Sequence, residues 1–151
     1  MPFDVYDPGL ADEVNKGVPE FNRALCYLAV NDKPLALKWF KAALAKDPGN
    51  EIARSRLAEL YFAAQDYAGV ASLFARVPIT KDTDDDAILR GAESMARTGD
   101  VPRAISFLEG ALNQRSASGP LNMALAGFYR GEGNIQKANQ LESKGRALTK
   151  E

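Results

Sequence analysis

The sequence has no histidine and a single cysteine, Cys26. Histidine is the commonest general base and metal ligand at neutral pH, so its absence argues against most acid–base and metal chemistry. One cysteine excludes an intrachain disulfide and a thiolate cluster. With no glycine-rich phosphate loop either, the sequence predicts no catalytic residue, no metal site and no cofactor, and we do not expect an enzyme. Cys26 lies in an apolar run, where we expect it to be buried.

Neither an excess of positive charge nor a long apolar run is present. The chain carries 19 Lys and Arg against 20 Asp and Glu, so it has no field that would attract nucleic acid or an anionic membrane. Its uncharged stretches fall short of the roughly 20 residues that span a bilayer, which argues against direct membrane insertion. The N-terminus has no basic patch followed by an apolar run. This favours the cytoplasm, and the periplasm stays open for a chain that has lost a signal.

What the chain does contain is a repeat. Cutting it at residues 17, 51, 85 and 119 aligns small residues in two columns and aromatic residues or methionine in a third. The columns are Ala24, Ala58, Ala92 and Ala126; Tyr27, Tyr61, Met95 and Tyr129; and Ala36, Val70, Ala104 and Ala138. A fixed period of this length is typical of a helical repeat array. We therefore expect one domain over 17–151, with repeats 17–50, 51–84, 85–118 and 119–151, and a separate extension over 1–16.

Each repeat is predicted to hold two helices, because apolar residues recur at spacings of three and four and are interrupted once. The interruption places an Asp or Asn before each second helix, where its side chain can cap the helix. These residues are Asp32, Asp66, Asp100 and Asn134. The columns of small residues let paired helices approach closely. We expect the aromatic residues to fill the core beyond them, namely Tyr27, Phe40, Tyr61, Phe74 and Tyr129.

These residues resemble the tetratricopeptide-repeat (TPR) family. The resemblance rests on Ala24, Tyr27, Ala36, Phe40, Ala43 and Pro48 and on their echoes in the later repeats, and it covers residues 17 to about 150. It implies an all-α fold, a right-handed superhelix of four helix pairs. It also implies that the first helices line a concave groove for a peptide or helix of a partner protein, without a cofactor or a reaction.

The resemblance places candidate groove residues on the first helix of each repeat. They are Phe21, Leu25, Arg56, Phe62, Leu89, Arg90, Arg97, Met123 and Arg130. Three of them, Arg56, Arg90 and Arg97, are suited to gripping a carboxylate or an acidic segment. The alternative is that Arg56 and Arg90 only pair with Glu59 and Glu93, three residues further along the same helices.

One subclass of the family, the chaperone-binding adaptors, holds a C-terminal carboxylate with a Lys and an Asn of the first repeat, an Asn of the second, and a Lys and an Arg of the third. The equivalent positions here are Phe21, Leu25, Arg56, Asp86 and Arg90, and only Arg90 matches. We therefore do not expect such a clamp. The apolar first repeat favours a partner segment with hydrophobic anchors.

Three departures from the pattern carry further expectations. Pro78 should end its helix early and leave an acidic loop over 79–86. Within that run Asp82, Asp84, Asp85 and Asp86 lack the spacing of a calcium loop, so we interpret them as a linker and helix start. In the last repeat, Glu142, Gly145 and Arg146 should make the outer face of the final helix polar, as in a terminal repeat.

The N-terminal extension leaves alternatives open. Asp7 and Pro8, followed by Leu10 and Val14, predict one short helix that shields the first repeat. Phe3, Val5 and Tyr6 then either pack on the first helix pair, fray, or occupy the groove of the same or a neighbouring molecule.

For function, the sequence favours a protein–protein interaction module, an adaptor or assembly scaffold that binds a partner peptide or helix. The first alternative is a small TPR chaperone of a bacterial secretion system, although those usually have three repeats and a longer N-terminal helix. The second is a self-associating segment of a larger export or membrane-associated protein, for which the chain would form homo-oligomers.

Overall fold

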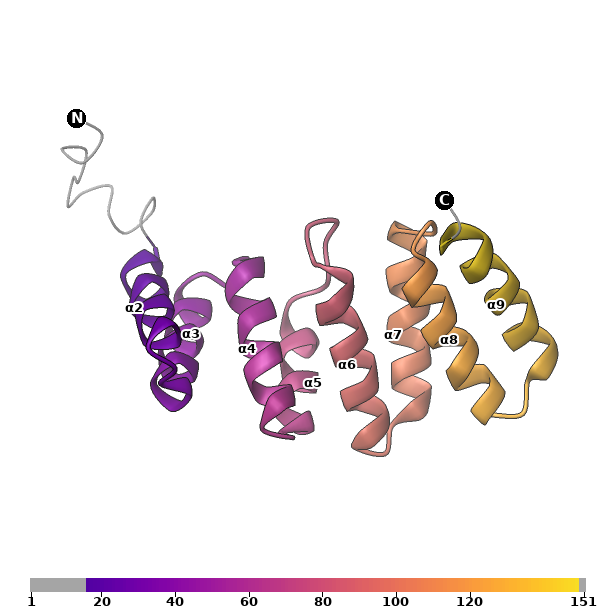
Figure 1. The fold of residues 1–151 in the computed structure, drawn as a ribbon, viewed down its shortest axis with the longest axis horizontal. Helices are drawn as coiled ribbons and strands as arrows, with labels where there is room; N and C mark the ends of the chain where they lie inside the picture. The colour runs from indigo at the N-terminus through magenta and orange to yellow at the C-terminus, as the bar shows by residue number, and fades with distance from the viewer. Residues whose placement is uncertain (1–15, 150–151) are drawn as a thin grey trace. The chain divides into compact units, whose positions relative to one another are not determined.

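The computed structural model describes residues 16–149, and every regular element within them is an α-helix. The chain divides into two compact units, one ending at Leu60 and the other beginning at Tyr61. In the first unit α2 (Val18–Ala29) packs against α3 (Lys33–Lys46), and α4 (Glu51–Ala63) begins there (Figure 1). The all-α class is therefore confirmed for the described residues.

The second unit contains five further helices in sequence order. They are α5 (Tyr67–Arg76), α6 (Asp85–Arg97), α7 (Val101–Gln114), α8 (Gly119–Gly131) and α9 (Ile135–Thr149). Each helix packs on the next from α5 to α9, and α6 also contacts α8 (Figure 1).

The turn inside each repeat has the same construction four times. One residue adopts a left-handed conformation, at Asn31, Gln65, Gly99 and Gly133. The N–H of the following residue then bonds back to the carbonyl of the Tyr27 column, as in Asp32 to Tyr27 at 2.8 Å, which satisfies an orphan carbonyl of the first helix. The predicted caps are confirmed: Asp32, Asp66, Asp100 and Asn134 accept from the backbone N–H three residues later.

The small-residue columns form the core contact between helices, as predicted. All eight of their members are buried, namely Ala24, Ala36, Ala58, Val70, Ala92, Ala104, Ala126 and Ala138. Side chains this small allow two helix backbones to approach closely. These columns therefore explain the close packing of α2 on α3, of α6 on α7 and of α8 on α9.

The aromatic prediction is only partly correct. Phe40 and Phe74 are buried, whereas Tyr27, Tyr61 and Tyr129 are half-buried. A phenol hydroxyl requires a polar partner, which keeps a tyrosine ring at the edge of the apolar core. The Tyr129 hydroxyl shows this directly, since it hydrogen-bonds to the Glu109 carboxylate at 3.0 Å.

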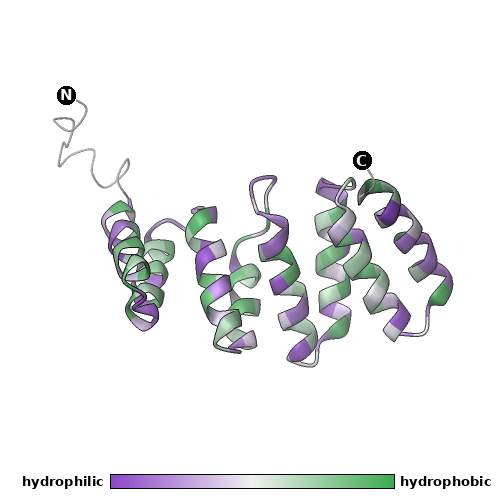
Figure 2. Cartoon of the chain, viewed as in Figure 1, coloured by the Kyte–Doolittle hydropathy of each residue, from purple (hydrophilic) through white to green (hydrophobic). Residues whose placement is uncertain are grey.

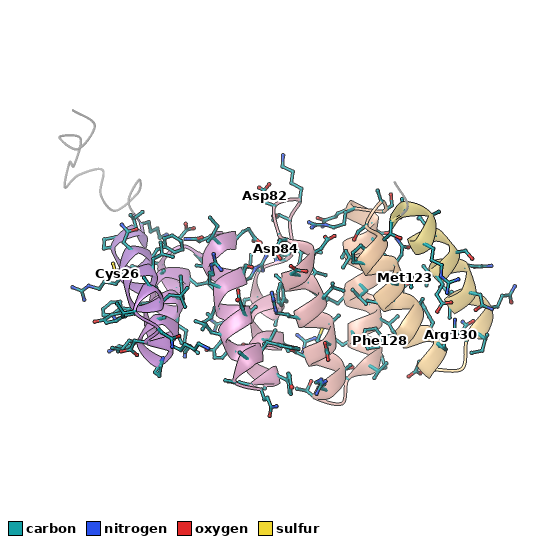
Figure 3. All side chains as sticks on the ribbon, in the orientation of Figure 1. Cys26, Asp82, Asp84, Met123, Phe128 and Arg130 are labelled. Atoms are coloured by element: carbon teal, nitrogen blue, oxygen red, sulfur yellow. The ribbon has the colours of Figure 1, made fainter. Side chains whose placement is uncertain are left out.

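The prediction for Cys26 is wrong, because the thiol is exposed (Figure 3). Cys26 follows the buried Ala24 by two residues. Two residues turn about 200° around an α-helix, so the two side chains leave α2 on nearly opposite sides. An apolar run along a helix therefore does not bury every one of its members.

The joint before α6 follows the expectation from Pro78. Helix α5 ends at Arg76, and the loop over 77–84 precedes α6. Figure 2 shows the tip of this loop as hydrophilic and its part next to α5 as hydrophobic, and Figure 3 marks Asp82 and Asp84 in it. Asp84 caps α6, because its carboxylate accepts from the Ala87 N–H at 2.7 Å. The interpretation of this run as a linker and helix start is confirmed, but the loop is shorter than the predicted 79–86, because Asp85 and Asp86 already belong to α6.

The last helix has a polar exposed face, as expected, but of the three residues expected to form it only Arg146 is exposed. Gly145 is buried where α9 crosses α8: a Cβ there would lie 3.2 Å from the Gly119 carbonyl oxygen. Glu142 is half-buried and pairs with Arg130 of α8 at 2.9 Å. Besides Arg146, the exposed polar residues of α9 are Gln136, Lys137, Asn139, Gln140, Ser143, Lys144 and Thr149. The repeat columns alone could not identify this face, because residues of the same helical turn lie partly against α8 and partly in solvent.

The predicted N-terminal helix, with Leu10 and Val14, lies outside the described residues, as do Phe3, Val5 and Tyr6. None of the helices described between residues 16 and 149 has both the length and the apolar character that crossing a membrane requires.

Candidate interaction surface

Helices α6 and α8 carry most of the predicted binding residues, on the faces that they do not bury. Along α6 the buried side is formed by Ala87, Ile88, Gly91, Ala92, Ser94 and Met95. Leu89, Arg90 and Arg97 fall on the other side, where Leu89 and Arg90 are half-buried and Arg97 is exposed. Met123 and Arg130 lie on α8, which contacts α6 within the same unit.

Arg97 is held in a small network with two aromatic residues. Its guanidinium lies 5.0 Å from the centre of the Tyr67 ring, and Nη1 is 3.3 Å from the Tyr67 hydroxyl. Phe62 packs edge-on against Tyr67, with ring centres 5.5 Å apart. The structure therefore brings two predicted residues, Phe62 and Arg97, into contact with Tyr67, a residue that the sequence analysis did not select.

The partner expected for Glu93 is wrong. Its carboxylate pairs with Arg97, four residues later, at 2.9 Å, and not with Arg90, three residues earlier. The i,i+4 arrangement with the acid first is the better oriented of the two pairings on a helix. The expected pair of Arg56 with Glu59 does form, at 3.6 Å, with both side chains about half exposed, so it contributes little to stability.

Among the arginines of α6 and α8, Arg90 is therefore the one that has no carboxylate partner among the described residues. Its guanidinium makes no ion pair or hydrogen bond with any residue between 16 and 149, although the residue is half-buried. A partly desolvated charge without a counter-charge is unfavourable, and a carboxylate brought to it would relieve that cost.

Arg130 and Met123 are directed toward α9. Arg130 donates to Asn139 Oδ1 at 3.0 Å and pairs with Glu142, and the Met123 side chain reaches Gly145; Figure 3 marks both residues on α8. Between them Gly127 is exposed, and a Cβ placed there would meet nothing within 4 Å. The exposed face of α8 therefore has open space at Gly127, on the same helix as Arg130, whose side chain is held by Asn139 and Glu142.

The remaining predicted residues belong to the other unit. Phe21 is half-buried and packs edge-on against Phe40, with ring centres 5.9 Å apart, so much of its ring serves the core. Leu25 is 38% exposed. Arg56 is exposed and paired as described above.

Two polar clusters escaped the sequence analysis. Arg54 is buried and donates to Glu51 at 2.6 Å. Arg115, at the end of α7, donates to the carbonyl oxygens of Thr80 and Thr83 and pairs with Asp85. No spacing signal identifies Arg115, because its partners lie about thirty residues away. Within the part of the chain that the structure describes, no three or more Cys, Asp or Glu side chains form a group that could hold a metal ion.

Residues 27–91 match the family model for the tetratricopeptide repeat. Among solved structures, the chain resembles a crystal structure of MamA with a TM-score of 0.73 at 15% identity, covering 97% of this chain and 86% of that one. It resembles MamA AMB-1 in space group P212121 with a TM-score of 0.72 at 20% identity, covering 98% and 79%. It resembles MamA MSR-1 in space group C2 with a TM-score of 0.64 at 18% identity, covering 99% and 84%.

A comparison with curated protein sequences finds no match. At these identities the structural likenesses concern the fold alone, and they agree with the all-α helical-repeat class predicted from the sequence. The resemblance inferred from the repeat columns is likewise confirmed over residues 27–91 by the family match.

Proposed function

We propose that this chain, a tetratricopeptide-repeat protein, is a non-catalytic interaction module, an adaptor or assembly scaffold that holds a peptide or helix of a partner protein. The partner segment contacts the exposed faces of the first helices of the repeats. In the unit that begins at Tyr61, those faces belong to α6 and α8.

The observation that carries this proposal is the state of Arg90. Arg97 and Arg130 each have a carboxylate partner within the chain, whereas Arg90 has none among the described residues. Arginine presents a planar fork of donors that matches a carboxylate. A partner carboxylate at Arg90 therefore gains charge-assisted hydrogen bonds without first breaking an internal ion pair.

The neighbourhood of Arg90 suits a segment with both acidic and apolar character. Leu89 is adjacent in sequence and half-buried, which gives an apolar contact beside the charge. On α8, Gly127 and Gly131 are exposed, and open space surrounds the position where a Cβ would lie. Small residues allow a partner backbone to approach closely. We infer an extended or helical segment that carries a carboxylate and an apolar anchor.

The test uses a displayed library of random peptides selected on the intact chain. Selected peptides should be enriched in Asp, Glu or a C-terminal carboxylate. In titration calorimetry, Arg90→Ala should weaken their binding by about 1.5–3 kcal/mol, since a hydrogen bond to a charged group is lost. Arg103→Ala is the matched control, because Arg103 is exposed on α7, and it should leave affinity unchanged.

Two outcomes contradict the site. If affinity does not respond to Arg90→Ala but falls on Leu25→Ala, the partner binds the apolar first repeat instead. If the library yields peptides without acidic character whose binding is insensitive to added salt, the carboxylate requirement is wrong, because a charge-based contact weakens as salt screens it.

A further inference from the structure

Helix α2 has an apolar face that none of the described helices of its own unit covers. Val18, Asn22, Leu25, Cys26 and Ala29 follow one another at helical spacing along the exposed side, and Asn22 is the one polar residue among them. Val18 is 42% exposed, and Val30, directly after the helix, is 73% exposed. Within its unit α2 packs on α3, which lies against the opposite side, that of the buried Ala24.

The helix at the other end of the described chain is built differently. The exposed residues of α9 are mostly polar or charged, and Figure 2 shows most of that helix as hydrophilic. Terminal repeats of an array require such a polar outer face, because no further repeat covers them. Helix α2 does not meet this requirement by itself. Its exposed face has the composition of a surface that another segment covers.

The segment immediately before α2 has the composition that this face calls for. Residues 1–15 contain the apolar side chains Phe3, Val5, Tyr6, Leu10 and Val14. Fifteen residues would extend about 22 Å as a helix, and the 12 residues of α2 extend about 18 Å, so the segment is long enough to cover the face. The chain enters α2 through Gly17 at φ 78°, a left-handed conformation that turns the backbone just before the helix.

The charges of the chain also favour a contact between residues 1–15 and the unit that contains α2. Residues 1–15 contain four acidic residues and no basic one, namely Asp4, Asp7, Asp12 and Glu13. Residues 16–60 carry eight Lys and Arg against five Asp and Glu. Opposite net charges draw the segment toward the unit that contains α2.

We propose that residues 1–15 fold back on α2 of the same molecule, with Leu10 and Val14 against Val18, Leu25 and Cys26. The contact closes the array at its N-terminal end, as the polar face of α9 closes it at the other. It does not depend on the proposed function, since the surface around Arg90 lies in the other unit. The contact does affect Leu25, because a Leu25 side chain covered by residues 1–15 is not accessible to a partner protein.

Cys26 allows a direct test, because it is the only cysteine in the chain and lies on this face. The measurement is the rate at which the intact chain reacts with a small maleimide under native conditions, relative to the chain unfolded in urea at the same pH. Cover by residues 1–15 should slow the native rate by about tenfold or more, since reaction then requires local opening. The double variant Leu10→Asp/Val14→Asp should restore the fast rate.

The matched control is Ile135→Asp, the same kind of change at an exposed apolar position on α9, which should leave the Cys26 rate at its wild-type value. Helical circular dichroism checks that all variants remain folded. A native Cys26 that reacts as fast as the unfolded chain overturns the proposal, as does protection that survives Leu10→Asp/Val14→Asp. Protection that rises with protein concentration, together with a dimer in sedimentation, also overturns it and assigns the face to a second copy.

Discussion

Arg115, directly after α7, pairs with Asp85 in the first turn of α6, with 3.2 Å between Nη1 and Oδ1. The same guanidinium donates to the carbonyl oxygens of Thr80 and Thr83 in the loop before α6. The other Asp85 oxygen accepts from the Ser118 hydroxyl at 2.6 Å. The Arg115 side chain therefore links the irregular loop between the second and third repeats to the C-terminal end of α7.

This arrangement predicts that Arg115→Ala destabilises the chain by about 1.5–3 kcal/mol, because hydrogen bonds from a charged donor to a partly buried site are lost. Arg103→Ala, at an exposed position of α7, should change stability by no more than about 0.5 kcal/mol. Urea unfolding measures both. Equal effects would mean that the Arg115 contacts do not hold the loop.

Two glycines on neighbouring helices should respond to alanine with opposite signs. Gly91 of α6 is buried, and a Cβ there would lie 2.9 Å from the ring of Phe74 and 3.1 Å from that of Phe107. These rings pack against each other at 5.2 Å and have little room to move. Gly110 of α7 has nothing within 4 Å of its Cβ position.

Gly91→Ala should therefore destabilise the fold by about 1–3 kcal/mol through overpacking, despite the better helix propensity of alanine. Gly110→Ala should stabilise it by about 0.5–1 kcal/mol, because propensity acts there without a clash. Thermal unfolding followed by circular dichroism decides the signs. A stabilising Gly91→Ala would show that the packing of Phe74 and Phe107 on α6 is looser than described.

The ion pair between Glu20 of α2 and Lys46 of α3, at 2.6 Å, predicts a pH dependence. The hydrogen bond from the Lys46 ammonium lowers the pKa of the Glu20 carboxyl below its ordinary value of 4.5. A lowered folded-state pKa contributes stability above the unfolded value, and this contribution is lost as pH falls through the folded pKa. Stability should thus decline below pH 4.5 in part because this pair is broken.

The check compares urea midpoints at about pH 6 and about pH 3 for the wild type and Glu20→Gln. The variant should be the less stable at the higher pH and should lose less on acidification. Glu132→Gln, at an exposed position after α8, is the control and should reproduce the wild-type loss. A Glu20→Gln profile parallel to that of the wild type would show that the pair contributes nothing to the pH dependence.

Much of the fold could be predicted from the sequence because its signals are local. A cap such as Asp32 needs only a backbone N–H three residues away, and Pro78 limits α5 through its own ring. Ala24 and Ala36 recur at a fixed period because the same close helix contact recurs. None of these signals depends on which distant side chain is finally met.

The candidate site could be predicted less well. The sequence placed Leu89, Arg90 and Arg97 on one helix, and the exposed side of α6 does carry them. It did not predict that Glu93 pairs with Arg97, that Tyr67 stacks beneath Arg97, or that Arg130 is engaged by Glu142. The last two of these contacts join different helices.

The amino-acid sequence by itself determined the helices, their caps and their repeat, since each of these depends on residues within a few positions of one another. The tertiary structure alone decided that Cys26 is exposed, that Gly145 is buried at a helix crossing, and that Arg115 closes a loop about thirty residues away. The physical reason is that burial and ion pairing depend on side-chain direction and on the neighbouring element, and a one-dimensional pattern specifies neither.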